Sequence, residues 1–434
     1  MDINSIILAA GKGKRMNSNL PKPLHKVAGK TLLLWLQETL KKASVSKNIF
    51  VLGHDSEKLT KHIQGEEYVI QKPQLGTGHA VKLTKDKFDR PETIIIVAYA
   101  DTPFIEANTI KKMIDQIQNG FKISILGFET ENPSGYGRLI LNKKNEIIRI
   151  VEDSDADEEV KSITLCNSGV LAAKARDIFK FLDKVQLSNN GEYYLTDIIS
   201  ICSSQGSKVG YIISPEEELI GINNRADQAK AESFIQSKLI QKHLANGVTF
   251  FDPKSVYFDA SAEIESDVII EPNVFIGPNV KIESQSVIKA FSYLENCLIG
   301  ENCSIGPYAR IRPNTVIQEN AKIGNFVEIK SSVIGKNSKV NHLSYIGDSS
   351  IGLESNIGAG TITCNYDGIN KNKTTIGNNV FIGSNSSLIA PIKISDGSIV
   401  GAGSTISKDV KENSIAIERS IQKQFKKRNI KSKK

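Results

Sequence analysis

The sequence predicts a chain of two parts: an α/β domain with a doubly wound sheet, followed by a left-handed parallel β-helix built from hexapeptide repeats. Two observations lead to this fold class. Up to about residue 225, short apolar strands alternate with segments that have apolar residues at helical spacing. Beyond about residue 247, an aliphatic residue returns about every six positions. With 434 residues, the chain is long enough for each part to bury its own core.

The first part reads as alternating strands and helices. Strands are expected at 5–10, 48–53, 93–101, 122–128, 168–173 and 208–213, and helices at 32–43 and 108–120. Such an alternation builds an α/β sheet whose ligand site lies at the carboxyl ends of the strands. We expect this domain to span 1–225 and a helical linker to follow over 226–247, ended by Asn246 and Gly247.

The repeat domain is expected over 248–418. Ile, Leu or Val recurs at steps of six from 264 to 288, from 299 to 329, from 334 to 346, from 351 to 357 and from 376 to 406, with a step of five before 334 and another before 351. In a β-helix each such residue points inward, and stacked coils bury a column that no single coil buries. The segment CNYDGINKNKTT (364–375) breaks the repeat, so it must leave the column as a surface loop. Residues alone leave open whether this loop has a function.

Composition and charge narrow the class of protein. The chain is 40% hydrophobic and 24% charged, as in ordinary globular proteins. Residues 419–434 contain eight Lys or Arg and no acidic residue, whereas the whole chain has a net charge of +7. Residues 1–418 therefore have a net charge of −1, and no nucleic-acid partner is expected. The basic tail over 419–434 is either a solvated end or a contact for an anionic ligand or partner.

The cysteines and the apolar segments point to the cytoplasm. Five cysteines without CxxC spacing predict reduced thiols rather than disulfides or a zinc site. The sequence begins without a basic segment followed by a long apolar one, and it contains no apolar stretch long enough for a membrane span. We therefore expect a cytoplasmic protein that does not associate with membranes.

The first strand opens into LAAGKGKRM (8–16), followed by LPKPLH (20–25). Gly11 and Gly13 allow close backbone approach, and their amides with Lys12, Lys14 and Arg15 suit phosphate oxygens. The pattern is neither GxxxxGK[ST] nor GxGxxG, which excludes the common nucleotide fingerprints. Taken alone, it is also compatible with a plain tight turn.

With the motifs that follow, this half resembles the sugar nucleotidyltransferases, and among them the N-acetylglucosamine-1-phosphate uridylyltransferases. The matching motifs, in family order, are LAAGKGKRM...PK, QLGTGHA (74–80), YAD (99–101), GYGR (135–138), VED (151–153), CNSG (166–169), GEYYLTD (191–197) and GINNR (221–225). The resemblance implies that a set of residues binds UDP-N-acetylglucosamine: Leu8, Ala9, Ala10, Gly11, Lys22, Gln71, Gly76, Thr77, Tyr99, Ala100, Asp101, Gly137, Glu152, Asn167 and Asn223. Within this set, Leu8 to Gly11, Gln71, Gly76 and Thr77 would hold the uracil nucleotide, and Gly137, Glu152, Asn167 and Asn223 would line the sugar pocket.

The expected reaction joins two polyanions, because a sugar phosphate attacks the α-phosphorus of UTP. Cations must therefore screen the growing charge, and Arg15 and Lys22 are the expected catalytic groups. Asp101 and Asn223 are oxygen ligands suited to Mg²⁺. The family commonly has Gly at the position of Ala100, so Ala100 would cost free energy if its backbone needed a positive φ.

The second half resembles the acetyltransferase part of the same bifunctional enzyme. The matching segments are NFVEIK (325–330), VNHLSYIGD (340–348), NIGAGTITCNY (356–366) and GSNSSLIAP (383–391). Acetylation of an amine requires a base, and imidazole is suited to this near neutral pH. His342 lies two residues after the inward Val340, so it is expected on the surface, with Glu328 orienting it. A lone exposed histidine is more often inert.

The resemblance also implies ligand residues for acetyl transfer. Glucosamine 1-phosphate would contact Arg312, Lys330, Tyr345 and Asn356. Acetyl-CoA would contact Ala359, Asn365, Tyr366, Ser384, Ala402 and Arg419, with Asn365 donating to the thioester oxygen. Such β-helices associate as trimers in the family, so a homotrimer is expected.

The leading hypothesis is a bifunctional enzyme that uses small-molecule substrates. It acetylates glucosamine 1-phosphate from acetyl-CoA and then transfers a uridylyl group from UTP to the product, giving UDP-N-acetylglucosamine. In the alternative, the chain is a nucleotidyltransferase only, and the β-helix is a trimerisation or regulatory module. A non-enzymatic solenoid is a third hypothesis, against which the loop and the cluster of Arg312, Lys330 and His342 argue.

Overall fold

The computed structural model describes residues 2–11, 13–53, 56–188 and 190–426. The chain divides into two compact units, Met1–Ile235 and Gln236–Lys434. No helix in the described part of the chain is long and apolar enough to cross a membrane. Lys12 and residues 427–434 of the basic tail, both named in the sequence analysis, lie outside the described residues.

The first unit is built on a mixed sheet with strand order β11-β7-β10-β6-β1-β4-β5. Its strands are β1 (Ile3–Ala9), β4 (Lys47–Leu52), β5 (Glu67–Ile70), β6 (Ile94–Tyr99), β7 (Ile123–Glu129), β10 (Leu165–Lys174) and β11 (Val209–Ile213), with β8 (Arg138–Leu141) and β9 (Ile147–Val151) as a side hairpin. A short pair, β2 (Lys26–Val27) and β3 (Lys30–Thr31), lies outside it. All six predicted strands are present. The pairs β1–β4 and β1–β6 are parallel, whereas β10 runs antiparallel to β6 and β7.

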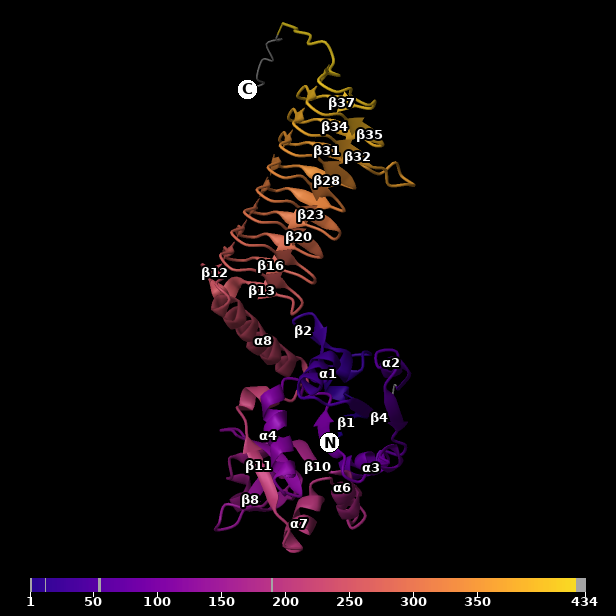
Figure 1. Cartoon of the computed structure of the whole chain (residues 1–434), viewed down its shortest axis with the longest axis vertical. Helices are drawn as coiled ribbons and strands as arrows, with labels where there is room; N and C mark the ends of the chain where they lie inside the picture. The colour runs from indigo at the N-terminus through magenta and orange to yellow at the C-terminus, as the bar shows by residue number, and fades with distance from the viewer. Residues whose placement is uncertain (1, 12, 54–55, 189, 427–434) are drawn as a thin grey trace, which may run out of the picture. The chain divides into compact units, whose positions relative to one another are not determined.

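Helices cover both faces of this sheet. They are α1 (Leu32–Lys42), α2 (Ser56–Thr60), α3 (Thr77–Lys82), α4 (Ala107–Gln118), α5 (Glu158–Lys161), α6 (Ala175–Leu182) and α7 (Asp197–Ser204). Alternate residues of each strand enter different cores: Ile7 packs with residues of α1 and α4, and Ile6 with residues of α3, α6 and α7. The predicted α/β domain is therefore confirmed, with one strand reversed (Figure 1).

The predicted connecting segment is the helix α8 (Arg225–Ala245), followed by Asn246 and by Gly247 at φ 86°. Its first half belongs to the first unit, where the Glu232 carboxylate accepts from the Ala28 amide at 2.9 Å. Its second half belongs to the second unit, where the Gln236 side chain bonds both the amide and the carbonyl of Phe258. The helix thus forms hydrogen bonds within each unit, and its Ile240 belongs to the core of the second.

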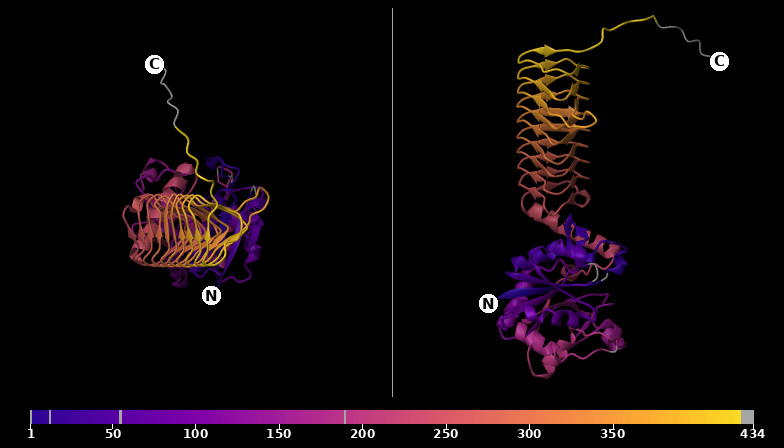
Figure 2. Two further views of the ribbon diagram at one scale, coloured as in Figure 1. Left: turned by 90° about the horizontal axis from the view of Figure 1, so that it is seen from above. Right: turned by 90° about the vertical axis from the view of Figure 1, so that its right-hand side faces the viewer.

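The second unit is the predicted β-helix, whose coils stack in Figures 1 and 2. Each coil contributes one short strand to each of three parallel sheets, here called the first, second and third faces. The first face contains β12 (Thr249–Phe250), β15 (Ile269–Ile270), β18 (Val287–Ile288), β21 (Ser304–Ile305), β24 (Lys322–Asn325), β27 (Lys339–His342), β30 (Asn356–Ile357), β33 (Phe381–Ile382), β36 (Ile399–Val400) and β38 (Ile415–Ala416).

The second face contains β13 (Tyr257–Phe258), β16 (Phe275–Ile276), β19 (Tyr293–Leu294), β22 (Arg310–Ile311), β25 (Glu328–Lys330), β28 (Tyr345–Gly347), β31 (Ile362–Cys364), β34 (Ser387–Ile389) and β37 (Thr405–Ile406). The third contains β14 (Glu263–Ile264), β17 (Lys281–Ile282), β20 (Cys297–Ile299), β23 (Thr315–Ile317), β26 (Val333–Ile334), β29 (Ser349–Ile351), β32 (Thr374–Ile376) and β35 (Ile392–Ile394). The recurring Ile, Leu and Val residues form one buried column through the stack.

Aromatic residues form a column on the outside of the β-helix. Phe291, Tyr308 and Phe326 occupy the same corner, between the first and second faces, in successive coils, each with a positive φ. Their rings stack at centroid distances of 4.9 and 5.0 Å and remain about half exposed. Leu343 continues the column and is 62% exposed. Bulky residues rarely adopt a positive φ, so this corner is an unusual apolar surface.

The interruption at 364–375 leaves the stack as predicted. It departs after β31 and rejoins at β32, so residues 365–373 form the loop beside β32 in Figure 1. Inside the loop, Tyr366 pairs with Lys371 in an antiparallel bridge. The Asp367 carboxylate accepts from the Ile369 and Asn370 amides at 2.8 and 2.6 Å. The loop therefore has a defined turn of its own.

Candidate active sites

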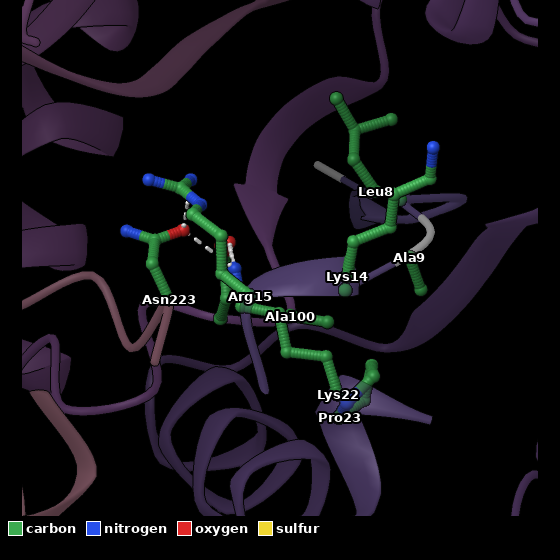
Figure 3. Close-up of a pocket in the computed structure, with 11 residues that line it drawn as sticks. Leu8, Ala9, Lys14, Arg15, Lys22, Pro23, Ala100 and Asn223 are labelled. Carbon is green, nitrogen blue, oxygen red and sulfur yellow. Dashed lines mark hydrogen bonds and ion pairs between the residues drawn. The ribbon is translucent and has the colours of Figure 1, made fainter. Parts of the chain in front are cut away.

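The first site is a cavity of about 310 Å³ at the carboxyl end of β1 (Figure 3). Its lining residues come from the turn after β1, from the segment at 22–23 and from two later loops: Leu8, Ala9, Gly11, Gly13, Lys14, Arg15, Lys22, Pro23, Ala100, Asp101 and Asn223. Gly13 has a φ of 56°, and a Cβ there would lie 3.2 Å from the Cβ of Lys22. Glycine thus lets the turn pack closely against the lysine.

Lys22 is the centre of a polar cluster in this cavity. Its Nζ forms an ion pair with Asp101 and donates to Asn223 Oδ1 at 2.8 Å. Arg15 Nη2 donates to the same Asn223 oxygen at 3.1 Å. The structure therefore brings together four of the residues predicted for catalysis and metal binding.

Two backbone contacts fix the oxygens of this cluster. The Asp101 carbonyl accepts from the Ile222 amide at 2.9 Å, which joins the loop after β6 to the loop before α8. The Asn223 amide donates to Asp227 Oδ2 at 2.9 Å, in the first turn of α8. Asp101 and Asn223 are thereby held with their side-chain oxygens around one cationic group.

Ala100 does not carry the backbone strain that its place in the motif suggested. It is not among the residues with a positive φ, and its amide donates to the Leu8 carbonyl at 3.1 Å. An alanine adopts a negative φ without strain. The expected cost of replacing glycine here is therefore absent.

A second group of predicted residues lies where β5 ends and α3 begins. Gln71 Nε2 donates to the Gly76 carbonyl at 2.9 Å, and Gln74 Nε2 donates to the carbonyl of Ala10. Gly76 has a φ of 94°, and a Cβ there would lie 2.6 Å from the Tyr193 carbonyl oxygen. Thr77 Oγ1 accepts from the Leu195 amide at 3.1 Å. Side-chain and backbone contacts thus hold the QLGTGHA segment against β1 and the 193–195 segment.

The residues predicted to line the sugar pocket also converge. The Asn167 amide donates to the Gly137 carbonyl at 2.7 Å, and a Cβ on Gly137 would lie 3.2 Å from the Glu152 carboxylate. Glu152 accepts from Thr196 Oγ1 at 2.7 Å. Burial raises the pKa of Glu152 more than the Thr196 hydroxyl lowers it. Burial likewise raises the pKa of the nearby Tyr99 hydroxyl, so it stays protonated.

The second site is a column along the corner between the first and second faces of the β-helix. Val340 pairs with Ile357, Ile357 with Ile382, and Ile382 with Val400. His342 stands two residues after the first of these. Ala359, Ser384 and Ala402 stand two residues after the other three. The register therefore stacks the predicted base and three predicted acetyl-CoA residues in one line.

The partner of His342 is not the one expected. His342 Nδ1 bonds Asn325 Oδ1 at 2.7 Å, whereas Glu328 accepts from Arg312 Nη1 at 2.7 Å. The carboxylate of Glu328 is thus engaged by the guanidinium of Arg312, and no contact with His342 supports the predicted orienting role of Glu328 here. Sequence reasoning missed Asn325, although it pairs with His342 in the coil below.

Another group of predicted residues lies on and just after β28. Asn365 Nδ2 donates to Asp348, and Lys330 Nζ lies 3.9 Å from the same carboxylate. A Cβ on Gly347 would lie 2.5 Å from Tyr345 Oη, so glycine admits the phenol there. Lys330 and Asn365 thus meet at Asp348, just after β28, and Tyr345 begins that strand, whereas His342 precedes it.

Three further residues of the predicted set lie around the same faces. Asn356 begins β30 on the first face, and Tyr366 is 61% exposed on the loop. The side chain of Arg419 lies beside Gly403, because a Cβ on that glycine would be 3.8 Å from Arg419 Cδ. The register of β36 and β38 puts Glu418, two residues after Ala416, at the next position of the column, so Arg419 lies one residue beyond it.

Comparison with known proteins finds similar sequences for both halves of the chain. Residues 5–162 match the family of MobA-like NTP transferase domains, and residues 293–430 match the GMPPB C-terminal domain. The bifunctional protein GlmU of Zymomonas mobilis is 44% identical over 426 residues, covering 96% of this chain and 95% of the relative. GlmU of Maricaulis maris is 48% identical over 422 residues, covering 96% and 93%. GlmU of Streptococcus uberis is 42% identical over 438 residues, covering 96% of each.

These matches span both units and almost the full length of each relative. The chain therefore belongs to the GlmU family and is a bifunctional enzyme of UDP-N-acetylglucosamine synthesis, with uridylyltransferase and glucosamine-1-phosphate acetyltransferase activities.

Proposed function

We propose that the cavity at the end of β1 is the uridylyl-transfer site and that the column headed by His342 is the acetyl-transfer site. One observation carries the first assignment: Lys22 Nζ and Arg15 reach the same side-chain oxygen of Asn223, in a cavity large enough for a triphosphate group. The strand register that stacks His342 with three small residues carries the second.

In the first site, the phosphate of N-acetylglucosamine 1-phosphate attacks the α-phosphorus of UTP, and pyrophosphate leaves. Lys22 and Arg15 offset the negative charge that builds on the phosphate oxygens. The attacking phosphate is already ionised near neutral pH, so the reaction needs no general base.

Asp101 and Asn223 fit a magnesium ion, because their two oxygens already converge on one cation, the ammonium of Lys22. The described residues contain no group of three His, Cys, Asp or Glu that could hold a metal. Mg²⁺ accepts such a site, since it keeps several waters and takes one or two carboxylates together with substrate phosphates. A magnesium ion held by Asp101 and Asn223 would supply positive charge to the triphosphate, and Lys22 would pair with the phosphate oxygens.

The other predicted residues form the base and sugar subsites. The residues from Leu8 to Gly11, with Gln71, Gly76 and Thr77, hold the uracil nucleotide. Tyr99 and Ala100 lie beside Asp101, while Gly137, Glu152 and Asn167 line the sugar pocket. The contacts that support this division join residues within each subsite: Gln71 with Gly76, and Asn167 with Gly137.

In the second site, His342 is the general base that removes a proton from the amine of glucosamine 1-phosphate. Because Asn325 Oδ1 is an acceptor, the proton of the neutral imidazole lies on Nδ1. Nε2 therefore keeps its lone pair for the amine. Asn325 thus takes the orienting role that the sequence analysis gave to Glu328.

The amino-sugar phosphate is bound by Arg312, Lys330, Tyr345 and Asn356. Acetyl-CoA lies along Ala359, Ser384, Ala402 and Arg419 and contacts Asn365 and Tyr366. The small side chains of the column leave a smooth path for an extended ligand, and Arg419 suits its phosphates.

We further propose that the protein is a homotrimer in the cytoplasm, acting on small molecules without nucleic-acid or membrane partners. Two observations support a multi-chain acetyl site. Asn365 and His342 lie at opposite ends of β28, so one acetyl-CoA reaches both most simply from two chains. The exposed aromatic column needs a covering surface.

Assays of both activities on single variants test the two sites separately. His342→Ala is expected to lower kcat for acetyl transfer by about 100-fold or more, the scale of general-base catalysis, and to leave uridylyl transfer unchanged. Lys22→Met is expected to lower kcat/KM for uridylyl transfer by about 100-fold and to leave acetyl transfer unchanged. The neighbouring exposed Lys26→Met is the control. Loss of the same activity in both variants would contradict the assignment.

Sedimentation analysis of Phe326→Asp tests the trimer. A carboxylate in the stacked column is expected to give monomers that keep uridylyl transfer and lose acetyl transfer. A variant that stays trimeric with full acetyl transfer would place the interface elsewhere.

A further inference from the structure

The histidine of the QLGTGHA segment has no role in the sites described so far. His79 lies in α3, and its Nδ1 is 3.4 Å from Nε2 of Gln71, at the long end of hydrogen-bonding distance. The ring also lines a cavity of about 400 Å³, together with Leu75, Gly78, Lys82, Leu182, Val185 and Tyr193. His79 is therefore within hydrogen-bonding distance of Gln71, a residue predicted to bind the base.

Both ends of this contact are fixed by the backbone. The Gln71 amide donates to the Leu52 carbonyl at 2.7 Å, which anchors the glutamine at the end of β5. The Gly78 amide donates to the Tyr193 carbonyl at 2.8 Å, which anchors α3. A Cβ on Gly78 would lie 2.9 Å from that carbonyl oxygen, so the close approach depends on glycine.

The contacts of Gln71 determine which atom of its amide faces the ligand. Its NH₂ group donates to the Gly76 carbonyl at 2.9 Å, and the same nitrogen lies 3.4 Å from His79 Nδ1, which accepts its second proton when the ring proton is on Nε2. With both protons directed into the protein, Oε1 is left without a hydrogen-bond partner among the described residues. A glutamine held in this way offers an acceptor to a ligand, and not a donor.

The neutral form of His79 is suited to accept this bond. Burial, with a further effect of Lys82, lowers the pKa of His79 below its ordinary value. Lys82 itself is paired with Asp183 at 3.0 Å. A neutral ring accepts at one nitrogen, whereas a protonated ring would present two donors and repel the NH₂ group.

We propose that His79 is a positioning residue that holds the Gln71 amide with its oxygen toward the base and thereby favours UTP over CTP. Uracil presents an N3–H, which donates to Oε1. Cytosine presents a lone pair at N3, which meets the same oxygen and is repelled. Without His79 the amide is held by Gly76 alone and turns more readily, so cytosine is excluded less strictly. This inference rests on the proposed role of Gln71 in binding the base.

The test compares kcat/KM for UTP and for CTP in His79→Leu and His79→Asn. Leucine removes the acceptor, whereas the asparagine oxygen can take the place of Nδ1. We expect the UTP/CTP ratio to fall about fivefold in His79→Leu, the effect of one weak hydrogen bond, and to stay within about twofold in His79→Asn. The acetyl-transfer activity of each preparation measures the amount of folded protein.

His62→Leu is the matched control, because His62 is exposed and distant in sequence from the motif. In a Gln71→Ala background, His79→Leu is expected to change the ratio no further, since the group that it positions is gone. An unchanged ratio in His79→Leu, or equal losses in His79→Leu and His79→Asn, would overturn the inference. If Gln71→Ala itself leaves the ratio unchanged, the proposed base site is wrong, and the inference falls with it.

Discussion

Ala100 shows how the local backbone decides whether a departure from a motif matters. Its amide bonds the Leu8 carbonyl, and its φ is not positive. Ala100→Gly is therefore expected to leave kcat/KM for uridylyl transfer within about twofold and to lower stability by up to about 1 kcal/mol through added backbone freedom. Steady-state kinetics and thermal unfolding measure the two effects. A large gain in activity would mean that the methyl group obstructs the ligand.

Among single residues, those fixed by a motif were predictable, and their exact partners were not. Lys22, Asp101 and Asn223 could be named from their motifs, and the structure gathers them. That His342 bonds Asn325, with Glu328 bound to Arg312, depends on the rotamers of four side chains. Asn325 and His342 occupy equivalent positions in successive coils, so the repeat register could have identified this pair, which the motifs did not.

At the scale of elements, the loop after β31 depends on one carboxylate. Backbone amides of Asn370 and Ile369, with the Asn372 side chain, lower the pKa of Asp367, so it accepts these bonds as an anion. Asp367→Ala is expected to loosen the turn and raise KM for acetyl-CoA several-fold, while Tm and uridylyl transfer stay unchanged.

Asn370→Ala is the control for that variant, because it keeps the backbone amide that Asp367 accepts from. Initial rates over a range of acetyl-CoA concentrations separate the two variants. Equal KM values in Asp367→Ala and the unmodified protein would show that acetyl-CoA does not contact the loop.

The elements themselves were largely predictable because their apolar patterns are strong. The six apolar strands and the six-residue period are local signals. The direction of β10 is not determined by its local sequence, because its run of small apolar residues suits a parallel or an antiparallel strand equally. Its pairing with β6 and β7 determines the direction. The strand β5 escaped prediction because it is short and only partly buried.

For the whole molecule, α8 determines where the chain can be divided. Asp227 in its first turn holds the Asn223 amide, and Gln228 donates to the Lys26 carbonyl. A fragment of residues 1–245 is therefore expected to keep uridylyl transfer, whereas residues 1–225 lose most of it. Activity per folded molecule, with circular dichroism as the measure of folding, distinguishes them. Full activity in the shorter fragment would show that α8 does not support the site.

The pH dependence of stability is expected to report on the packing of α8 against the first coil. His243 is buried beside Phe258, with ring centroids 4.9 Å apart, and burial lowers its pKa to about 4. Because the unfolded chain binds the proton more tightly, stability is full above about pH 6.5 and falls as the pH drops toward 4, by at most about 3 kcal/mol.

His243→Phe removes the titrating group and keeps the ring contact. The Tm difference between this variant and the unmodified protein is expected to grow in favour of the variant as pH falls from about 7 to 4.5. A difference that is constant across this range would show that His243 is not the group responsible.

The two ends of the β-helix differ, and this gives the stack a direction. At the first coil, Gln236 and the buried Ile240 of α8 cover the end. At the last, β38 pairs with β36 on one side, and no described residue pairs with its other edge. Each coil contacts only its neighbours. A mechanical load applied at the carboxyl end would therefore unfold the coils one after another, starting from the last.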